Sequence, residues 1–430
     1  MKQVVIIGLG KTGLSCVTYF RQRGITPLIM DTRENPPGKE SLPADCRLIA
    51  GPLDTDVLCS ASLIVASPGV ALASPALQAA KAAGVEIIGD IELFAREAKA
   101  PIVAITGSNG KSTVTSLVGL MAGQAGFKVG VGGNIGTPAL DLLLAPADLY
   151  VLELSSFQLE TTSSLQPTAA VILNLSEDHL DRYDGMAGYL AAKQRIFAHA
   201  KHIVINRDDV ATLPPEQPYW QSFGLNNEAY GRISQPDGLW LSVAGKPVLP
   251  VAELNIVGAH NQMNALAAMA LADAVGIPQV AQLAVLRSFT GLAHRCQFVR
   301  EVNGVRWIND SKATNVGSTL AAVAGVSESV QGRLWLLAGG QGKGQDFSPL
   351  QPLLAGPIYQ MICFGQDADI LMKLSDNTQR VADLDEAVVS VAAQVKAGDW
   401  VLLAPACASL DQFRSFEQRG QRFADLVNAL

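Results

Sequence analysis

The sequence has few of the residues that build disulfide scaffolds, metal clusters or nucleic-acid-binding surfaces. Its six cysteines are scattered over 430 residues without a C-x-x-C pair, so we expect free thiols and a cytoplasmic location. Acidic residues outnumber basic ones by 39 to 32, and the formal charge of −7 disfavours a nucleic-acid partner. No apolar run approaches the ~18 residues of a membrane-spanning helix, so we expect no membrane span. These absences favour a soluble, cytoplasmic protein.

The composition permits large buried cores. Hydrophobic residues make up 49% of the chain and charged residues 17%, which is typical of globular proteins. At roughly 150 residues per domain, this length corresponds to about three domains. Short Val/Ile/Leu runs alternate with Ala-rich amphipathic stretches, as in α/β domains with parallel sheets. We therefore expect an α/β protein of three domains.

Three sets of apolar runs predict where the strands and domains lie. The first set comprises 4–7, 28–30, 63–66 and 87–89. The second comprises 102–105, 149–152, 170–173 and 203–205. The third comprises 305–308, 334–337, 361–364 and 401–403. Between the second and third sets, the polar segment 214–250 predicts turns and minor strands. The predicted domains are 1–89, 90–291 and 292–430.

The first predicted strand leads into a glycine-rich turn. Gly8-Leu9-Gly10-Lys11-Thr12-Gly13 matches G-x-G-x-x-G between a strand and a helix. Such glycines let a phosphate approach the helix N-terminus, where free N–H groups favour anions. Asp31 ends the next strand and is placed to accept hydrogen bonds from a ribose. The motif predicts a nucleotide site, and it leaves open a nicotinamide, a flavin, another nucleotide or a turn without a ligand.

A second phosphate-binding pattern follows the strand 102–105. Thr106-Gly107-Ser108-Asn109-Gly110-Lys111-Ser112-Thr113 contains the G-K-S-T core of a P-loop, although Ile105 replaces the usual first glycine. In such loops backbone N–H groups cradle phosphates, the lysine neutralises their charge and the hydroxyl reaches Mg²⁺. The pattern predicts ATP or GTP with Mg²⁺, and the enzyme classes it allows are ligase, kinase and NTPase.

Acidic, histidine and lysine residues follow the next strands of the same unit. Glu153 ends the strand 149–152, and His179 lies among acids after the strand 170–173. Loops at the carboxyl ends of parallel strands meet the ligand, so both could bind a metal near the γ-phosphate. The alternatives are a capping or surface carboxylate for Glu153 and a solvated loop histidine. Lys193 alone resembles an ordinary helix-surface lysine.

Polar residues also lie at the start of a predicted helix near 261 and at the ends of three predicted strands in the last unit. Asn261 or Asn264 could either cap a helix or bind a ligand, and Arg295 could reach a nucleotide in the preceding domain. Three strand ends carry the polar loops Asn309–Asn315, Gly339–Gly344 and Ala404–Asp411. Together these loops predict a binding edge in the third domain.

The ordered set of motifs resembles the Mur ligase family over essentially the whole chain. The motifs are T-G-S-N-G-K-S-T, E-L-S-S-F-Q, N-x-x-E-D-H-x-D-R, A-A-K, H-N-x-x-N, H-R and N-D-S-K-A-T-N. The opening G-L-G-x-T-G and the terminal A-C-A-S-L-D-Q-F-x-x-F-E-x-R-G favour the members that add D-glutamate to UDP-N-acetylmuramoyl-L-alanine. The resemblance implies a Rossmann-like N-terminal domain, a central P-loop ATPase-type mononucleotide-binding domain and a Rossmann-like C-terminal domain.

The resemblance also assigns residues to three sites. It implies a UDP-sugar site, and not a nicotinamide site, at Lys11, Thr12, Asp31, Thr32, Arg33, Ser67, Gly69 and Asn134. It implies ATP binding by Gly110, Lys111, Ser112, Thr113, Asn264, Arg295 and Asp310. It implies amino-acid binding by Lys312, Thr314, Lys343, Ser409, Leu410 and Phe416. Two Mg²⁺ ions would be held by Ser112, Glu153, His179 and Lys193, with the lysine N-carboxylated. Lys111, His179 and Lys193 are the implied catalytic residues.

The implied reaction is the ATP-dependent formation of an amide bond through an acyl phosphate, in cytoplasmic peptidoglycan precursor synthesis. A monomer is expected, and its partners would be UDP-N-acetylmuramoyl-L-alanine, D-glutamate and ATP. Three alternatives remain open. They are a nicotinamide dehydrogenase, a related ligase with another amino acid, and a non-catalytic nucleotide sensor.

Overall fold

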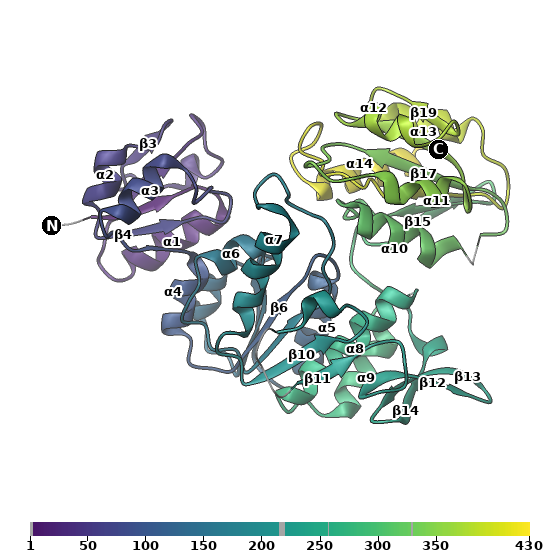
Figure 1. Cartoon of the computed structure of the whole chain (residues 1–430), viewed down its shortest axis with the longest axis horizontal. Coiled ribbons are helices and arrows are strands. Elements are labelled where there is room, and N and C mark those ends of the chain that lie inside the picture. Colours follow the sequence, from purple (N-terminus) through teal and green to yellow (C-terminus); the bar gives the residue numbers. More distant parts are fainter. Residues whose placement is uncertain (1–2, 215–219, 257, 328–329) are drawn as a thin grey trace.

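The computed structural model describes residues 3–214, 220–256, 258–327 and 330–430. These residues form three β-sheets in succession along the chain, each packed against helices (Figure 1). The predicted α/β class with three units is confirmed. No helix within the described residues has the length and apolar content that crossing a membrane requires.

The first sheet has five strands, and all neighbouring strands run parallel. Its order, β3-β2-β1-β4-β5, is Rossmann-like, with ligand sites beyond the carboxyl ends of the strands. Buried Val and Ile side chains on both faces explain why β1 and β4 are continuous apolar runs. The elements are β1 (Val4–Ile7), α1 (Lys11–Arg21), β2 (Leu28–Asp31), β3 (Leu48–Ala50), α2 (Thr55–Ser60), β4 (Leu63–Ala66), α3 (Pro75–Ala82) and β5 (Ile87–Ile88).

The central sheet has nine strands in the order β14-β13-β12-β11-β10-β9-β6-β8-β7. The seven neighbouring strands β7, β8, β6, β9, β10, β11 and β12 pair in parallel. The strands β12, β13 and β14 form an antiparallel extension. Side chains alternate between two cores, so that Val103 and Val151 lie in one and Ala104 and Leu152 in the other. The strands are β6 (Ile102–Thr106), β7 (Val129–Gly133), β8 (Leu149–Glu153), β9 (Ala169–Ile172), β10 (His202–Asn206), β11 (Gln221–Phe223), β12 (Tyr230–Gln235), β13 (Gly238–Val243) and β14 (Lys246–Pro250).

The helices of the central unit cover both faces of this sheet. Val114 and Leu117 of α5 share a core with Leu266 of α8 and Val285 of α9. The core on the other face contains Ile91 of α4 and also includes residues of the first unit. The helices are α4 (Asp90–Glu97), α5 (Lys111–Gln124), α6 (Ser156–Glu160), α7 (Gly185–Gln194), α8 (Ala259–Ala274) and α9 (Gln279–Ser288).

The third sheet has six strands in the order β15-β16-β20-β17-β18-β19. Only β15 runs antiparallel to its neighbour, and the remaining pairs are parallel. The strands are β15 (Gln297–Val302), β16 (Val305–Asn309), β17 (Leu334–Gly339), β18 (Ile358–Phe364), β19 (Thr378–Arg380) and β20 (Trp400–Leu403). The helices are α10 (Val316–Ser327), α11 (Gln351–Leu354), α12 (Ala368–Leu371), α13 (Leu384–Ala392) and α14 (Phe416–Asn428).

All twelve apolar runs expected to be strands coincide with strands of the structure, to within a few residues at their ends. The strands that the sequence did not reveal are β3, β7, β15 and β19, and each lies at the edge of its sheet. Edge strands are buried less completely, so they lack the continuous apolar pattern of a central parallel strand. The segment 214–250 contains the minor strands that were expected, and its residues 215–219 lie outside the described ones. The limits 1–89, 90–291 and 292–430 stay a prediction.

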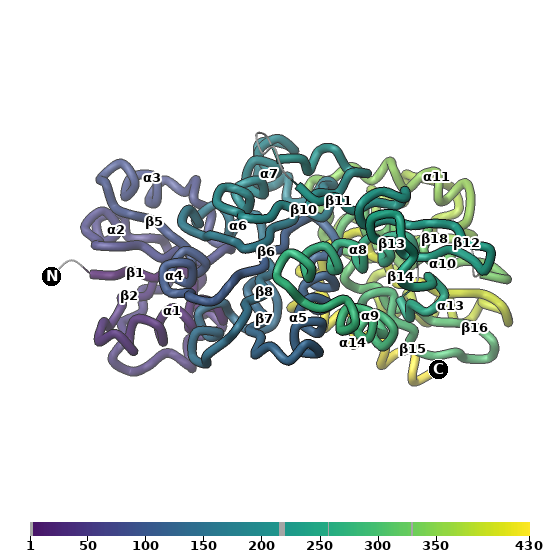
Figure 2. The backbone as a smooth tube through the Cα atoms, turned by 90° about the horizontal axis from the view of Figure 1, so that it is seen from below, coloured from purple at the N-terminus to yellow at the C-terminus, as the bar shows by residue number. Residues whose placement is uncertain are grey.

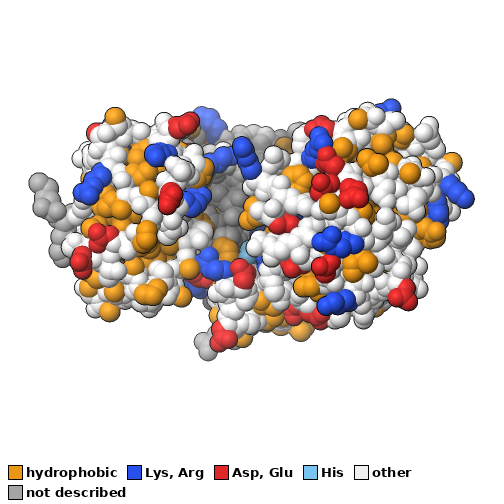
Figure 3. Space-filling model, turned by 90° about the horizontal axis from the view of Figure 1, so that it is seen from above, with side chains coloured by type: hydrophobic (Ala, Val, Ile, Leu, Met, Phe, Trp, Pro, Cys, Tyr) orange, Lys and Arg blue, Asp and Glu red, His pale blue; other side chains and the backbone are white. Residues whose placement is uncertain are grey.

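The two outer domains lie at opposite ends of the molecule, with the central domain between them (Figure 1). The view turned by 90° in Figure 2 keeps the same order from the N-terminal to the C-terminal domain. The space-filling view in Figure 3 shows a hollow between the outer domains, with Lys and Arg side chains on both walls. The outer domains therefore face each other across a space above the central domain.

Candidate active site

The phosphate loop connects β6 to α5 and depends on two left-handed glycines. Gly107 has φ +149° and Gly110, the residue before α5, has φ +82°. A side chain at Gly110 would overlap the amide of Asn264 on α8. The Lys111 ammonium donates to the carbonyl oxygens of Gly107 (2.8 Å) and Ser108 (3.0 Å). The loop thus holds a lysine against its own backbone, where an incoming phosphate could replace the carbonyl partners.

Asn264 lies inside α8 and does not cap it. The residue before α8 is Gly258, which has no side chain that could cap the helix, and Asn261 and Asn264 both lie within the helix. The capping alternative is therefore wrong. Asn264 is buried, donates to Asn261 Oδ1 at 3.2 Å and lies beside the phosphate loop, where it can reach a bound nucleotide.

Arg295 connects the start of the third domain to the phosphate loop. Its Nη2 donates to Ser112 Oγ at 2.6 Å, across 183 residues of sequence. Ser112 begins α5 and is buried. Asp310, which follows β16, is also buried, and this burial raises its pKa to about 6. The predicted ATP-binding residues of both domains therefore lie around the same loop.

Glu153 presents one carboxylate oxygen that the protein leaves unused. Oε1 accepts a hydrogen bond from Asn134 Nδ2 at 2.7 Å, and Oε2 is buried without a hydrogen-bond partner among the described residues. Burial alone would raise the pKa of Glu153, but the Lys111 ammonium and nearby donors hold it below its usual value. The group is thus a buried carboxylate, and the capping or surface alternative is wrong. A free carboxylate oxygen beside a phosphate loop fits Mg²⁺.

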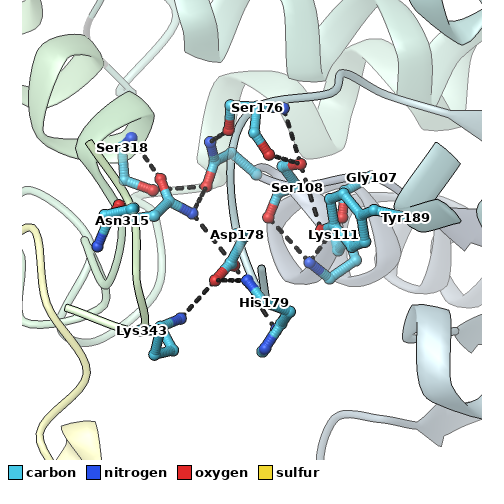
Figure 4. Close-up of polar contacts among 12 residues, drawn as sticks. Gly107, Ser108, Lys111, Ser176, Asp178, His179, Tyr189, Asn315, Ser318 and Lys343 are labelled. Carbon is cyan, nitrogen blue, oxygen red and sulfur yellow. Dashed lines mark hydrogen bonds and ion pairs between the residues drawn. The ribbon is translucent and has the colours of Figure 1, made fainter. Parts of the chain in front are cut away.

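His179 and Asp178 lie where the central and third domains meet (Figure 4). The Asp178 carboxylate pairs with the Lys343 ammonium and accepts from Asn315 Nδ2 at 3.4 Å. The His179 ring packs against Phe157, with 4.8 Å between ring centroids, and its side chain is half-buried. Its backbone has φ +57°, an uncommon conformation for a residue with a side chain. The turn is held by contacts with both domains.

Lys193 on α7 is fully buried, so the surface-lysine alternative is wrong. The residue is 1% exposed, and its ammonium donates to Gly107 O at 2.9 Å and lies 4.6 Å from the Tyr189 ring centroid. Burial lowers the pKa of Lys193 well below its usual value, and the Lys111 charge lowers it further. Within the part of the chain that the structure describes, no three His, Cys, Asp or Glu side chains are close enough together to hold a metal ion.

One cavity of about 980 Å³ contains most of these groups. Its walls come from the phosphate loop, β8, the His179 turn, α8 and the first part of the third domain. The predicted site residues that line it are Gly110, Lys111, Ser112, Thr113, Asn134, Glu153, His179, Lys193, Asn264, Arg295, Asp310, Lys312, Thr314 and Lys343. The cavity joins the predicted nucleotide, metal and amino-acid groups in one place.

The predicted UDP-sugar residues of the first domain lie outside this cavity. The Asp31 carboxylate is buried and accepts from Leu9 N at 2.7 Å and from Arg33 Nη2 at 2.7 Å. Although burial opposes it, the Arg33 guanidinium and the backbone donors lower the pKa of Asp31 to about 2. Both oxygens of Asp31 therefore already accept hydrogen bonds within the protein. Ser67 Oγ donates to Gly8 O at 3.1 Å. The remaining predicted residues, Lys11, Thr12, Thr32 and Gly69, are half-buried or exposed near the same strand ends.

The remaining predicted amino-acid-binding residues lie at the carboxyl edge of the third sheet. The Lys312 ammonium is 3.9 Å from the centroid of the Phe416 ring, and burial lowers the pKa of Lys312 to about 8. Ser409 is buried, whereas Leu410 is 67% exposed. Phe416, Ser409 and Leu410 do not line the cavity. They lie in the loop after β20 and at the start of α14.

Several polar residues that bridge the domains were not among the predicted site residues. Asn315 Nδ2 donates to Asn109 Oδ1 at 3.2 Å and to Asp178, and Ser318 Oγ donates to the same Asn109 oxygen. Arg182 donates to the carbonyl oxygen of Val70 at 3.3 Å and so reaches the first domain. The motifs contained Asp178, Asn315 and Arg182, but only the fold shows which residues they meet.

We predict that His179 has a pKa of about 4, so its imidazole is neutral at pH values above 4. Burial opposes the charged form more strongly than Asp178 favours it. The unfolded chain protonates histidine near pH 6.5, so the unfolding free energy should fall as pH drops from about 6.5 to 4. An NMR titration measures this pKa, and the His179→Asn variant identifies the signal. A midpoint near 6.5, or equal acid sensitivity in wild type and variant, would contradict the prediction.

Comparison with known families covers most of the chain. The Mur ligase MurD-like N-terminal domain matches residues 2–89, the Mur ligase middle domain matches 105–272, and the Mur ligase glutamate ligase domain matches 294–407. Among curated proteins, the UDP-N-acetylmuramoylalanine–D-glutamate ligase of Salmonella typhimurium is 58% identical, over all of this chain and 98% of the relative. The protein of the same name from Escherichia coli is 57% identical over the same shares.

Solved structures share the fold at lower identity. The UDP-N-acetylmuramate-alanine ligase MurC of Thermotoga maritima matches with a TM-score of 0.64 at 19% identity, and both chains are covered completely. A pseudomurein peptide ligase type C from Methanothermus fervidus matches with a TM-score of 0.65 at 19% identity, again over both whole chains. The family profiles and full-length relatives together lead to one conclusion. The chain belongs to the Mur ligase family.

Proposed function

We propose that this chain is an ATP-dependent ligase that joins D-glutamate to UDP-N-acetylmuramoyl-L-alanine by an amide bond. The observation that carries the proposal is the single cavity that contains Lys111, Glu153, Lys312 and Lys343. A triphosphate, an acceptor carboxylate and an amine can react only where all three meet. Relatives at 57–58% identity that bear the name of this activity support the choice of D-glutamate.

The reaction has two steps in this proposal. A carboxylate oxygen of the lactyl-L-alanine group attacks the γ-phosphorus of ATP, the bond from phosphorus to the ADP oxygen breaks, and an acyl phosphate forms. The amine of D-glutamate, after losing a proton, then attacks the acyl carbon. The carbon–oxygen bond to phosphate breaks, and the amide and inorganic phosphate are released. Lys111 and Arg295 lower the repulsion between the acceptor carboxylate and the triphosphate.

Gly110, Ser112, Thr113, Asn264 and Asp310 complete the proposed ATP site. When bound beside these residues, Mg²⁺ would supply positive charge that offsets the charge of the phosphates. In this proposal two ions would be held by Ser112, Glu153, His179 and a carboxylated Lys193. A neutral His179 suits both of its open roles, since it can ligate a metal or accept the amine proton.

The outer domains hold the other two substrates in this proposal. The UDP-sugar lies against the strand ends of the first domain, at Lys11, Thr12, Asp31, Thr32, Arg33, Ser67 and Gly69, and reaches Asn134 beside Glu153. D-Glutamate lies at the edge of the third domain, at Lys312, Thr314, Lys343, Ser409, Leu410 and Phe416. We also propose a cytoplasmic monomer whose three domains are 1–89, 90–291 and 292–430. Six free cysteines and a site built from one chain support this.

We expect Lys111→Ala to lower turnover by about 10²–10³-fold or more, because the variant loses the cation that faces the γ-phosphate. ADP release with all three substrates measures the effect, and calorimetry should show an unchanged fold. Lys201→Ala, at an exposed lysine of the same domain, is the matched control and should keep full activity. Near-normal turnover in Lys111→Ala would contradict the assignment of this loop as the site that binds the ATP phosphates.

We propose that Lys193 is N-carboxylated, since its buried environment favours the neutral amine that attacks CO₂ with loss of a proton. ¹³C-labelled bicarbonate should therefore give a carbamate NMR signal in the native protein. The signal should be absent in Lys193→Met, which replaces the amine with an apolar side chain of similar length. A native protein that shows no carbamate signal and retains full activity would refute this assignment.

A further inference from the structure

Arg419 is a completely buried arginine on α14. None of its surface is exposed, and it is among the largest fully buried side chains of the described residues. Its guanidinium donates four hydrogen bonds. They run to Ser311 Oγ (3.0 Å), Ser311 O (2.8 Å), Cys407 O (3.1 Å) and Gly339 O (3.4 Å). Burial lowers the pKa of Arg419 to about 10, so the group stays charged at neutral pH.

All four acceptors are uncharged. Within the described part of the chain, Arg419 forms no ion pair with a carboxylate. Asp411 is the carboxylate whose charge acts on it, but this residue is exposed and its Oδ2 accepts from the backbone N–H of Gln366. A buried charge without a counter-ion is expensive, because carbonyl dipoles only partly replace water. The fold thus retains a positive charge here that no group of the protein neutralises by direct contact.

The bonds of Arg419 end at three neighbouring strand ends of the third sheet. Ser311 follows β16, Gly339 ends β17 and Cys407 follows β20. These strands are adjacent in the order β16-β20-β17. Arg419 therefore lies directly beneath the carboxyl edge of the sheet, inside the loops that carry the proposed amino-acid site.

Two of these partners, Ser311 and Cys407, also lead to proposed amino-acid-binding residues. Ser311 precedes Lys312 in the chain, and its hydroxyl donates to the backbone oxygen of Phe416 at 2.8 Å. Cys407 lies two residues before Ser409 in the loop after β20. A single buried guanidinium therefore connects the backbone that carries Lys312, Phe416 and Ser409.

We infer that Arg419 determines the preference for an acidic amino acid, by keeping an uncompensated positive charge beneath the amino-acid site. The inference rests on the proposed function and adds a residue that does not touch the substrate. A dicarboxylate amino acid brings one more negative charge than its amide. That additional charge offsets the positive charge of Arg419, and the amide cannot. Charges interact over several ångströms in a dry interior, so direct contact is not needed.

A purely structural role for Arg419 would have different consequences. Loss of the hydrogen bonds to Ser311, Gly339 and Cys407 would loosen the loops for every amino acid alike. Loss of the charge would change the ratio between charged and uncharged amino acids. Discrimination between D-glutamate and D-glutamine, which have nearly the same shape, therefore separates the two roles.

The experiment compares kcat/KM for D-glutamate and D-glutamine in wild type, Arg419→Lys and Arg419→Gln, by ADP release and product mass. We expect Arg419→Gln to lower the glutamate-to-glutamine ratio at least tenfold, mainly through the KM for D-glutamate. Arg419→Lys should keep most of the ratio, and the KM for ATP should change less than twofold. Arg422→Gln is the matched control, since this arginine lies on the same helix in an exposed ion pair with Asp385 and should change nothing.

Asp411→Asn tests the same inference without disturbing the buried side chain. It removes the one acidic group that acts on Arg419, so the KM for D-glutamate should fall about two- to threefold. An unchanged ratio in Arg419→Gln, or equal losses in the Lys and Gln variants, overturns the inference. If the Arg419 variants do not fold, an unchanged KM in Asp411→Asn overturns it instead. A wild type that does not use D-glutamate refutes the proposed function before any variant is compared.

Discussion

Positive charge is concentrated in one cavity between the central and third domains, and the other features of the site depend on it. Lys111, Arg295, Lys312 and Lys343 all line this cavity. Burial lowers the pKa of Lys111, Arg295 and Lys312. Like charges gathered in one cavity repel each other, so bound anions stabilise the arrangement. Phosphates and carboxylates are the ligands that such a cavity selects.

The two acidic residues Glu153 and Asp178 differ in how far their carboxylates are already paired within the protein. Glu153 faces Lys111 with a free oxygen, whereas Asp178 is occupied by Lys343 and Asn315. The Asp178 contacts also join the central and third domains, as do Arg295 with Ser112 and Asn315 with Asn109. The same polar groups that prepare the site thus hold two domains in register. Binding chemistry and domain arrangement are therefore linked in this protein.

The sequence predicted the features that local patterns determine. Buried parallel strands are continuous apolar runs that can be recognised in the sequence. Site residues such as Glu153 lie at the carboxyl ends of these strands, so they could be predicted as well. Lys111 was predicted because strand, glycine turn and helix form one short segment. Edge strands such as β7, whose sequence is Val-Gly-Val-Gly-Gly, have no such pattern. Their pairing is set by the neighbouring strand.

Contacts between distant segments could not be predicted in this way. The Arg295–Ser112 hydrogen bond spans 183 residues, and the Lys343–Asp178 pair spans 165. Motifs marked these residues as candidates, but only the fold shows which partner each one meets. The burial of Lys193 and the uncompensated charge of Arg419 likewise depend on what the chain packs around them. An arginine whose partners are backbone carbonyls and a serine hydroxyl cannot be recognised from the pattern of acidic residues.

The most direct test of the central claim is ADP release with ATP, Mg²⁺ and UDP-N-acetylmuramoyl-L-alanine, with the amino acid varied and the product mass determined. The account predicts ADP release and a product that carries one glutamate when D-glutamate is present, and neither with L-glutamate. Release with a different amino acid would keep the ligase chemistry and contradict the substrate. Tight ATP binding without ADP release for any amino acid would contradict the account as a whole.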